Sequence, residues 1–138
     1  MTDQLEYNRK LIEEFRATRG TPAGPFVNRP IVLLTTTGVK TGQPRTAPMM
    51  YIRDGERVLV VASNAGAVKH PAWFLNLAAH PQVTVEIGAE TYPAQAVVLE
   101  GADRQQLWEK ITSQFPFFSD HQAKIERQIP VVELKRIT

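Results

Sequence analysis

Apolar and polar residues alternate along the chain in short blocks that are typical of β-strands. Runs rich in β-branched residues are separated by turn-forming sequences, a pattern that favours strands over helices. On this basis we predict strands at 31–37, 46–53, 57–63, 82–87, 91–99 and 131–137. The pairs Asp54-Gly55 and Gly88-Ala89 indicate tight hairpin turns, so we expect mostly antiparallel neighbours.

Helical spacing of apolar residues occurs in four other segments. Residues 3–18 form an amphipathic pattern with mixed charges on the polar face. Further helices are predicted at 71–79, in a segment that Asp103 caps and Pro116 ends, and at 119–127. Strands joined by short turns, with helices beside them, indicate a mainly β fold with peripheral helices (α+β), a small barrel of about six strands.

The 138-residue length suits one barrel domain with a short N-terminal extension. Residues 20–30 are rich in proline and glycine, so they predict a connecting loop. We therefore assign residues 1–30 to an N-terminal helix and loop, and 31–138 to the barrel. The mixed charge of the helix favours capping of the domain, and peripheral contact with the inner face of a membrane is the alternative. Without a secretory signal, we expect a cytoplasmic protein.

The reactive side chains form no catalytic set by themselves. The chain has no cysteine, which excludes thiol nucleophiles, thiolate metal sites and disulfides. His70, His80 and His121 lack zinc-motif spacing, so no metal site is expected. Nucleophile-elbow, Walker A and dinucleotide-binding patterns are also missing. If this chain is an enzyme, a bound cofactor is expected to carry the reaction.

The positive charge is concentrated in one part of the chain. Residues 16–85 carry a formal charge of +6, whereas residues 1–15 and 86–138 carry −2 each. This distribution favours an anionic ligand near the central segment. Nucleic acid is disfavoured as that ligand, because aromatic residues are not interleaved with the bases and no nucleic-acid-binding motif is present.

Residues 36–45, Thr-Thr-Gly-Val-Lys-Thr-Gly-Gln-Pro-Arg, lie within this basic segment and follow the first predicted strand. Glycines allow backbone N–H groups to turn toward a ligand, Lys40 provides a point charge, and Arg45 provides a planar fork that matches phosphate or carboxylate oxygens. The decapeptide is therefore a candidate anion site. Taken alone, it is more typical of a charged hairpin turn.

Several motifs together resemble the deazaflavin-dependent nitroreductase family. They are residues 34–45, 53–58, 62–63, Lys69, 71–77 and 81–85, and the resemblance runs in order from Ile31 to the C-terminus. It implies an actinobacterial-type split β-barrel oxidoreductase that uses the reduced deazaflavin coenzyme F-420, with FMN as the less favoured cofactor.

The resemblance also implies roles for individual positions. Lys40 and Arg45, with the backbone of Thr41 and Gly42, are expected to grip the coenzyme's phosphate. Trp73 and Asn76, one helical turn apart, are expected to border the deazaflavin ring, with an ordinary core tryptophan as the alternative for Trp73. The full set of implied cofactor-binding residues is Lys40, Thr41, Gly42, Gln43, Pro44, Arg45, Ala62, Ser63, Asn64, Lys69, Trp73 and Asn76.

The acceptor pocket is expected at Met50, Phe115, Phe118 and His121. Relatives active on nitroimidazoles carry tyrosines in this region, and they carry a basic residue at the position of Val39 and a lysine at that of Asn64. Phenylalanine cannot donate a hydrogen bond to a nitro or quinone oxygen, a loss of about 0.5 to 1.5 kcal/mol each. An apolar conjugated acceptor is therefore expected and prodrug-type nitroreduction is disfavoured, with core packing as the alternative for both phenylalanines.

The function predicted from these features is hydride transfer from reduced F-420 to a small quinone, enone or nitroaromatic acceptor. A proton would come from solvent or from His121. A non-catalytic deazaflavin carrier and an FMN- or haem-using split-barrel protein are the alternatives. The sequence gives no indication of the oligomeric state.

Overall fold

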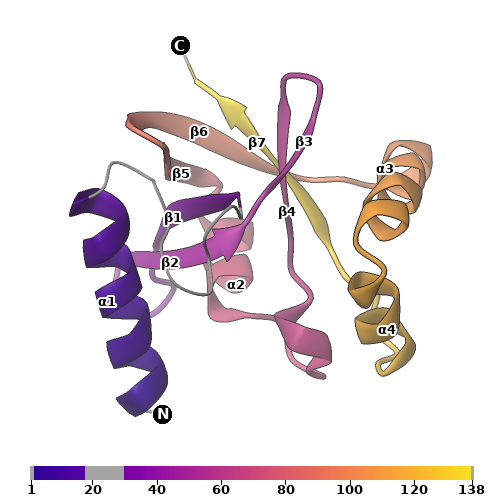
Figure 1. The fold of residues 1–138 in the computed structure, drawn as a ribbon, viewed down its shortest axis with the longest axis horizontal. Helices are drawn as coiled ribbons and strands as arrows, with labels where there is room; N and C mark the ends of the chain where they lie inside the picture. Colours follow the sequence, from indigo (N-terminus) through magenta and orange to yellow (C-terminus); the bar gives the residue numbers. More distant parts are fainter. Residues whose placement is uncertain (1, 18–29, 138) are drawn as a thin grey trace.

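The structure is a computed structural model that describes residues 2–17 and 30–137. Its strands are β1 (Ile31–Thr37), β2 (Pro44–Met50), β3 (Ile52–Asp54), β4 (Arg57–Val61), β5 (Gln82–Ile87), β6 (Glu90–Val98) and β7 (Val131–Arg136). Its helices are α1 (Thr2–Ala17), α2 (Ala72–Ala79), α3 (Gly101–Gln114), α4 (Phe117–Ala123) and the short 3-10 helix η2 (Asn64–Gly66) (Figure 1).

The seven strands form one antiparallel sheet in the order β2-β1-β5-β6-β7-β4-β3. The two edge strands, β2 and β3, are separated along the chain by Tyr51 alone. A sheet whose opposite edges are joined by one residue has to curl until those edges meet, which makes a split barrel. The predicted mainly β, antiparallel split barrel is thereby confirmed.

Several strands are nearly continuous apolar runs because both of their faces are buried. In β4, Val58 and Val60 point into the barrel, while Leu59 belongs to a cluster on the outer side. In β1, Val32 and Leu34 point inward. The inner cluster is completed by Leu77 of α2 and by Val83, Val85, Ala94, Ala96, Val132 and Leu134. Helix α2 therefore closes part of the barrel interior.

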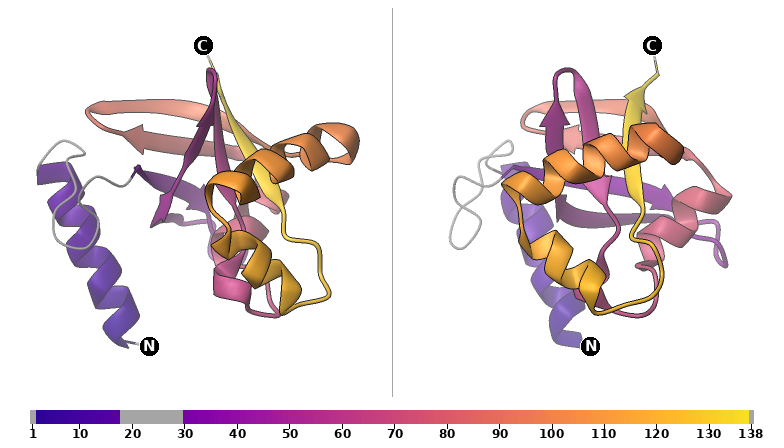
Figure 2. Two further views of the ribbon diagram at one scale, coloured as in Figure 1. Left: turned by 45° about the vertical axis from the view of Figure 1, so that its right-hand side comes forward. Right: turned by 90° about the vertical axis from the view of Figure 1, so that its right-hand side faces the viewer.

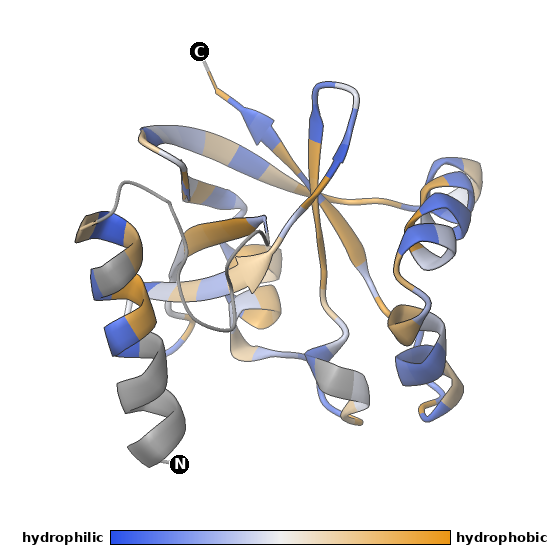
Figure 3. Cartoon of the chain, in the orientation of Figure 1, coloured by the Kyte–Doolittle hydropathy of each residue, from blue (hydrophilic) through white to orange (hydrophobic). Residues whose placement is uncertain are grey.

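Helices cover two outer faces of the curled sheet (Figure 2). Phe15 of α1 packs on Ile31 and Leu33 of β1. On the other side, Leu107 and Ile111 of α3 and Phe118 of α4 pack on Ile52, Leu59, Leu99 and Val131. Figure 3 shows that β1 and β4 are largely apolar and that apolar and polar residues are mixed along α3.

Helix α1 is also attached to the sheet by an ion pair. The Arg16 guanidinium donates to both carboxylate oxygens of Glu86 on β5, at 3.1 and 2.9 Å. The predicted loop at 20–30 lies outside the described residues except for Pro30. No helix in the described part of the chain is long and apolar enough to cross a membrane. The cytoplasmic location, the membrane contact and the two-part division of the chain stay predictions.

The structure corrects four local predictions. The predicted strand 46–53 is two strands, because the chain turns at Tyr51, whose N–H donates to the carbonyl of Pro30 (3.0 Å). The hairpin before β4 turns at Gly55-Glu56, one residue later than predicted, with Gly55 at φ 64°.

The other two corrections concern helix ends. Glu100, without a side-chain cap, precedes α3, and Asp103 instead accepts from Arg57 at 3.1 and 2.9 Å. The last predicted helix, 119–127, begins earlier and ends at Ala123, because the turn after it is fixed by contacts of residues 122 and 127 described below.

Candidate functional site

Loop 38–43 joins β1 to β2 and contains the predicted phosphate grip. The Gly38 N–H donates to the Gln43 carbonyl (2.8 Å), and the Gly42 N–H donates to the Gly38 carbonyl (2.9 Å). Gly42 has a φ of 68°, which side chains disfavour. A Cβ on Gly38 would lie 2.8 Å from Thr41 Oγ1. The conformation of this tight loop thus favours glycine at position 42, and a side chain at position 38 would crowd Thr41.

The two cations of this segment face solvent. Lys40 and Arg45 are exposed, and within residues 2–17 and 30–137 neither forms an ion pair. The N–H groups of Lys40 and Thr41 also donate to no acceptor within those ranges. Free cations beside free backbone donors are a chemically suitable site for an anion.

Asn76 of α2 fixes loop 38–43 through a hydrogen bond to its backbone. Its Oδ1 accepts from the Val39 N–H (3.2 Å), and its Nδ2 donates to Thr36 Oγ1 (3.1 Å). Asn76 is 8% exposed and Thr36 is 2% exposed. Both ends of the amide are therefore occupied by the protein itself. The Asn76 side chain is thus buried where it contacts loop 38–43, and its contact with the deazaflavin ring stays a prediction.

Trp73 lies one turn before Asn76 on the same helix. It is half-buried and packs against the inner cluster of the barrel. The two alternatives for Trp73 are both compatible with this position, since one part of the indole is in the core and another part is accessible. Its contact with a ring stays a prediction.

Segment 62–70 follows β4 and contains the second group of predicted cofactor residues. Ala62 and Ser63 are buried, whereas Asn64 and Lys69 are exposed. Asn64 has a φ of 49°, and its Nδ2 donates to the Lys69 carbonyl (3.0 Å). The segment is thus closed on itself, with the Lys69 carbonyl used internally.

Arg127 contacts segment 62–70, and the sequence did not predict this role. Its guanidinium donates to carbonyl oxygens of the segment 62–70 and contacts His70 Nδ1 (3.2 Å). These partners lie 57 to 65 residues away along the chain. No local motif marks such a contact, so only the fold brings Arg127 to this segment.

The electrostatics of His70 follow from this neighbour. Burial lowers the pKa of His70 from its ordinary value of 6.5, and the charge of Arg127 lowers it further. Phe74 covers the imidazole, with ring centroids 4.7 Å apart. His70 is therefore held neutral, with Nδ1 as the acceptor for Arg127.

The predicted acceptor residues come together on the side of the barrel covered by α3 and α4. Met50 and Phe115 pack against the outer cluster that contains Phe118. Phe118 lies between Phe115 and His121, with ring centroids 6.4 and 6.1 Å away. Phe118 is 6% exposed, so this ring is core, as the alternative reading of the sequence stated.

His121 and the exposed Phe117 differ from this core. The His121 Nδ1 is buried and has no hydrogen-bond partner in the described part of the chain. Phe117 is 41% exposed and lies 5.7 Å from the His121 ring. Phe117 is not among the residues predicted from sequence, because the predicted helix begins only at residue 119; in the structure it lies one turn before His121 on α4.

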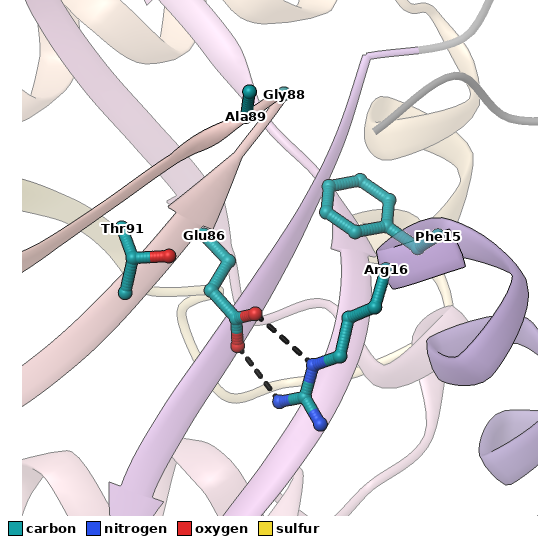
Figure 4. A pocket seen from close by; sticks show the side chains of 6 residues that line it. All are labelled: Phe15, Arg16, Glu86, Gly88, Ala89 and Thr91. Carbon is teal, nitrogen blue, oxygen red and sulfur yellow. Dashed lines mark hydrogen bonds and ion pairs between the residues drawn. The ribbon is translucent and has the colours of Figure 1, made fainter. Parts of the chain in front are cut away.

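Two hollows in the surface lie apart from these groups. One, of about 210 Å³, is lined by Phe15, Arg16, Glu86, Gly88, Ala89 and Thr91, between α1 and the β5–β6 hairpin (Figure 4). The other, of about 580 Å³, is lined by Thr37, Ala79, His80, Pro81, Gln82, Gln95 and Ile137. Neither is lined by a residue predicted to bind the cofactor or the acceptor.

Comparison with known proteins identifies the family. Residues 7–136 match the family described as F-420H(2)-dependent quinone reductase. An F-420H(2)-dependent quinone reductase of Mycobacterium tuberculosis is 38% identical over 110 residues, which cover 78% of this chain and 74% of the relative.

Solved structures agree with this assignment. A solved F-420-H2-dependent reductase is 39% identical with a TM-score of 0.70, covering 78% of this chain and 95% of that one. A structure described as a domain-swapped dimer is 36% identical with a TM-score of 0.73, covering 97% of this chain and 98% of that one. This chain belongs to the F-420H(2)-dependent quinone reductase family.

Proposed function

We propose that this protein is an oxidoreductase that reduces a quinone at the expense of reduced coenzyme F-420. Family membership supports both the coenzyme and the class of acceptor. The structural observation that carries the proposal is a pair of cations without ion-pair partners among the described residues. Lys40 lies on a loop that two glycines and Asn76 hold in place, and Arg45 lies at the start of β2.

The residues of loop 38–43 fit an anionic coenzyme. Lys40 and Arg45 would bind its phosphate, and the free N–H groups of Lys40 and Thr41 would donate to phosphate oxygens. Asn76 acts in this proposal as a positioning residue, since it fixes Val39 next to Lys40. Ser63, Asn64 and Lys69 would bind from segment 62–70, and Trp73 would border the ring.

The bound reduced deazaflavin would supply the hydride. Reduction of a quinone to its hydroquinone consumes one hydride and one proton. The protein's part is to orient the two reactants and to exclude water between them.

The side of the site near α4 suits an apolar acceptor. Phe117 offers an exposed aromatic surface, and Phe118 and Phe115 support it from the core. His121 would be the protein's proton donor to an acceptor oxygen, and its Nδ1 is a buried atom without a hydrogen-bond partner among the described residues. Solvent is the other proton source. Enones and nitroaromatics are further candidate acceptors, to be assayed alongside quinones.

A non-catalytic deazaflavin-binding protein is the second candidate function. The observation in its favour is the burial of Phe118, because a core phenylalanine leaves fewer residues to form an open acceptor wall. Tight binding of F-420 without turnover would distinguish it from a reductase.

A fluorescence titration with F-420, FMN and NADPH tests the cofactor. We expect saturable binding of F-420 and much weaker binding of the other two. Lys40→Ala with Arg45→Ala should weaken F-420 binding, whereas Lys135→Ala, another exposed lysine without an ion pair among the described residues, should not. Tighter binding of FMN than of F-420 would contradict the proposal.

A further inference from the structure

Arg127 lies between α4 and β7, two residues before the fully buried Ile129. Its guanidinium is surrounded by backbone carbonyls. Nε donates to Ala67 O (3.2 Å) and Val68 O (3.0 Å), Nη1 to Ala62 O (3.2 Å), and Nη2 to Ser63 O and Ala67 O (both 3.0 Å) and Lys69 O (3.3 Å).

These contacts use the whole donor set of the side chain. Arginine has five N–H donors in a fixed planar fork. Here they reach five carbonyl oxygens of one nine-residue segment and the Nδ1 of His70. Within residues 2–17 and 30–137, Arg127 has no carboxylate partner. Its charge is therefore compensated by the carbonyl dipoles of segment 62–70.

The orientation of the carbonyls determines the orientation of the N–H groups. In a trans peptide, the C=O of one residue and the N–H of the next point in opposite directions, and the chain has no cis peptide among its described residues. The carbonyls that converge on Arg127 therefore direct five N–H groups away from it. These belong to Ser63, Asn64, Val68, Lys69 and His70.

These five N–H groups donate to no acceptor in the part of the chain that the structure describes. Three of them belong to the exposed residues Asn64, Val68 and Lys69, so these free donors are available to oxygen atoms of a ligand. The side chains of Asn64 and Lys69 are exposed as well, and both residues are predicted to bind the coenzyme.

Arg127 is itself fixed to the helix of the acceptor residues. Gln122 of α4 donates to the Arg127 carbonyl (2.8 Å) and accepts from the Ile129 N–H (2.8 Å). Gly66 packs directly against α4, since a Cβ there would lie 3.3 Å from the Cα of His121. Segment 62–70 and helix α4 thus form one connected unit.

We propose that Arg127 is a positioning residue that turns the carbonyls of segment 62–70 inward, so that its N–H groups face the bound coenzyme, and that ties this segment to helix α4. The inference deepens the proposed function and rests on it. Arg127 does not touch the coenzyme. It sets the spacing between the coenzyme-binding segment and the acceptor residues on α4.

The test compares Arg127→Met and Arg127→Lys with wild type, and uses Lys135→Met as a control. Lys135 is an exposed base of β7 with no carbonyl contacts among the described residues. Hydrogen exchange of the coenzyme-free protein, F-420 affinity by fluorescence, and steady-state kinetics with reduced F-420 and a soluble quinone are measured for each variant. Millimolar guanidinium chloride is then added to Arg127→Met, with potassium chloride as the salt control.

We expect faster amide exchange of Gly66 and Ala67 in Arg127→Met, because their N–H groups are hydrogen-bonded within segment 62–70, with exchange in β1 and β5 unchanged. The F-420 dissociation constant should rise by at least about tenfold, because a displaced donor array no longer matches the ligand. The KM for the quinone should rise as well, since α4 is tied to the same unit. Guanidinium should restore part of the affinity, and Arg127→Lys should fall between Met and wild type.

Two results would overturn this inference. One is wild-type F-420 affinity in Arg127→Met. The other is a loss of protection spread evenly over the sheet and not reversed by guanidinium, which would show a purely structural residue. If Arg127→Met does not fold, the same criteria apply to Arg127→Lys. If the wild type itself does not bind F-420, the proposed function fails instead, a result distinct from unchanged affinity in the variant.

Discussion

The Asn76 contact offers a quantitative test of how loop 38–43 is held. Asn76→Leu keeps a side chain of similar size but removes the bonds to the Val39 N–H and to Thr36 Oγ1. Each bond contributes about 1 kcal/mol, and leaving the hydroxyl of Thr36, 2% exposed, without a partner costs about 1 kcal/mol more. The expected loss is about 3 kcal/mol, or about 10 °C in Tm for a chain of this size.

A double-mutant cycle isolates the buried bond. Thr36→Val removes the Thr36–Asn76 bond and leaves the buried Nδ2 of Asn76 without this acceptor, so it should cost about 2 kcal/mol. It should leave F-420 affinity nearly unchanged, because the Val39 bond remains. Asn76→Leu should weaken F-420 binding. Urea unfolding of the two single variants and the double variant gives the coupling energy. Losses that add within about 0.3 kcal/mol would refute a direct interaction between the two side chains.

Three further predictions concern the binding cations, the α4 contact and His70. Lys40→Ala with Arg45→Ala should weaken F-420 binding more strongly as salt is lowered, because salt screens the contribution of exposed charges. Phe118→Leu should change the order of quinone preference without changing F-420 affinity. Equal effects of the two changes on F-420 affinity in titrations would contradict this division of roles. Gly66→Ala should lower the free energy of unfolding, measured in urea, by about 1 to 2 kcal/mol, because the φ of 80° at Gly66 is unfavourable for alanine and the new Cβ would approach α4. An unchanged free energy of unfolding would contradict the close packing of Gly66 on α4. Burial and, to a smaller extent, Arg127 lower the pKa of His70 in the folded state. The stability that neutral His70 contributes is therefore complete above its unfolded pKa of 6.5 and is lost as the pH falls toward the folded pKa. Between about pH 7 and pH 5 the Tm of wild type should drop more than that of His70→Asn, and parallel Tm profiles would contradict this.

Local patterns predict the strands well because each strand is marked by its own residues. Asp54-Gly55 and Gly88-Ala89 each indicate a hairpin, and the second is found as predicted. The break at Tyr51 has no such mark, since it arises where the sheet curls and its two edges meet. The position of Asp103 was misjudged for a similar reason, because its partner Arg57 lies 46 residues away.

The candidate site likewise contains one part that local sequence predicts and another part that depends on long-range contacts. The glycines and cations of loop 38–43 are contiguous in sequence, so their likeness to an anion site is visible before folding. The use of Asn76 inside the protein depends on Thr36, 40 residues earlier. Arg127 is an unremarkable residue of a connecting segment until the fold brings segment 62–70 around it. Local sequence patterns therefore cannot predict the long-range hydrogen bonds of the site.

Anaerobic stopped-flow mixing of the protein with reduced F-420 and a soluble naphthoquinone tests the central claim most directly. We predict that the protein accelerates oxidation of the coenzyme well beyond the protein-free rate, with one hydroquinone formed for each coenzyme oxidised. Rates equal to the protein-free mixture with every quinone tested, although F-420 binds, would contradict the reductase account and leave the coenzyme-binding protein in its place.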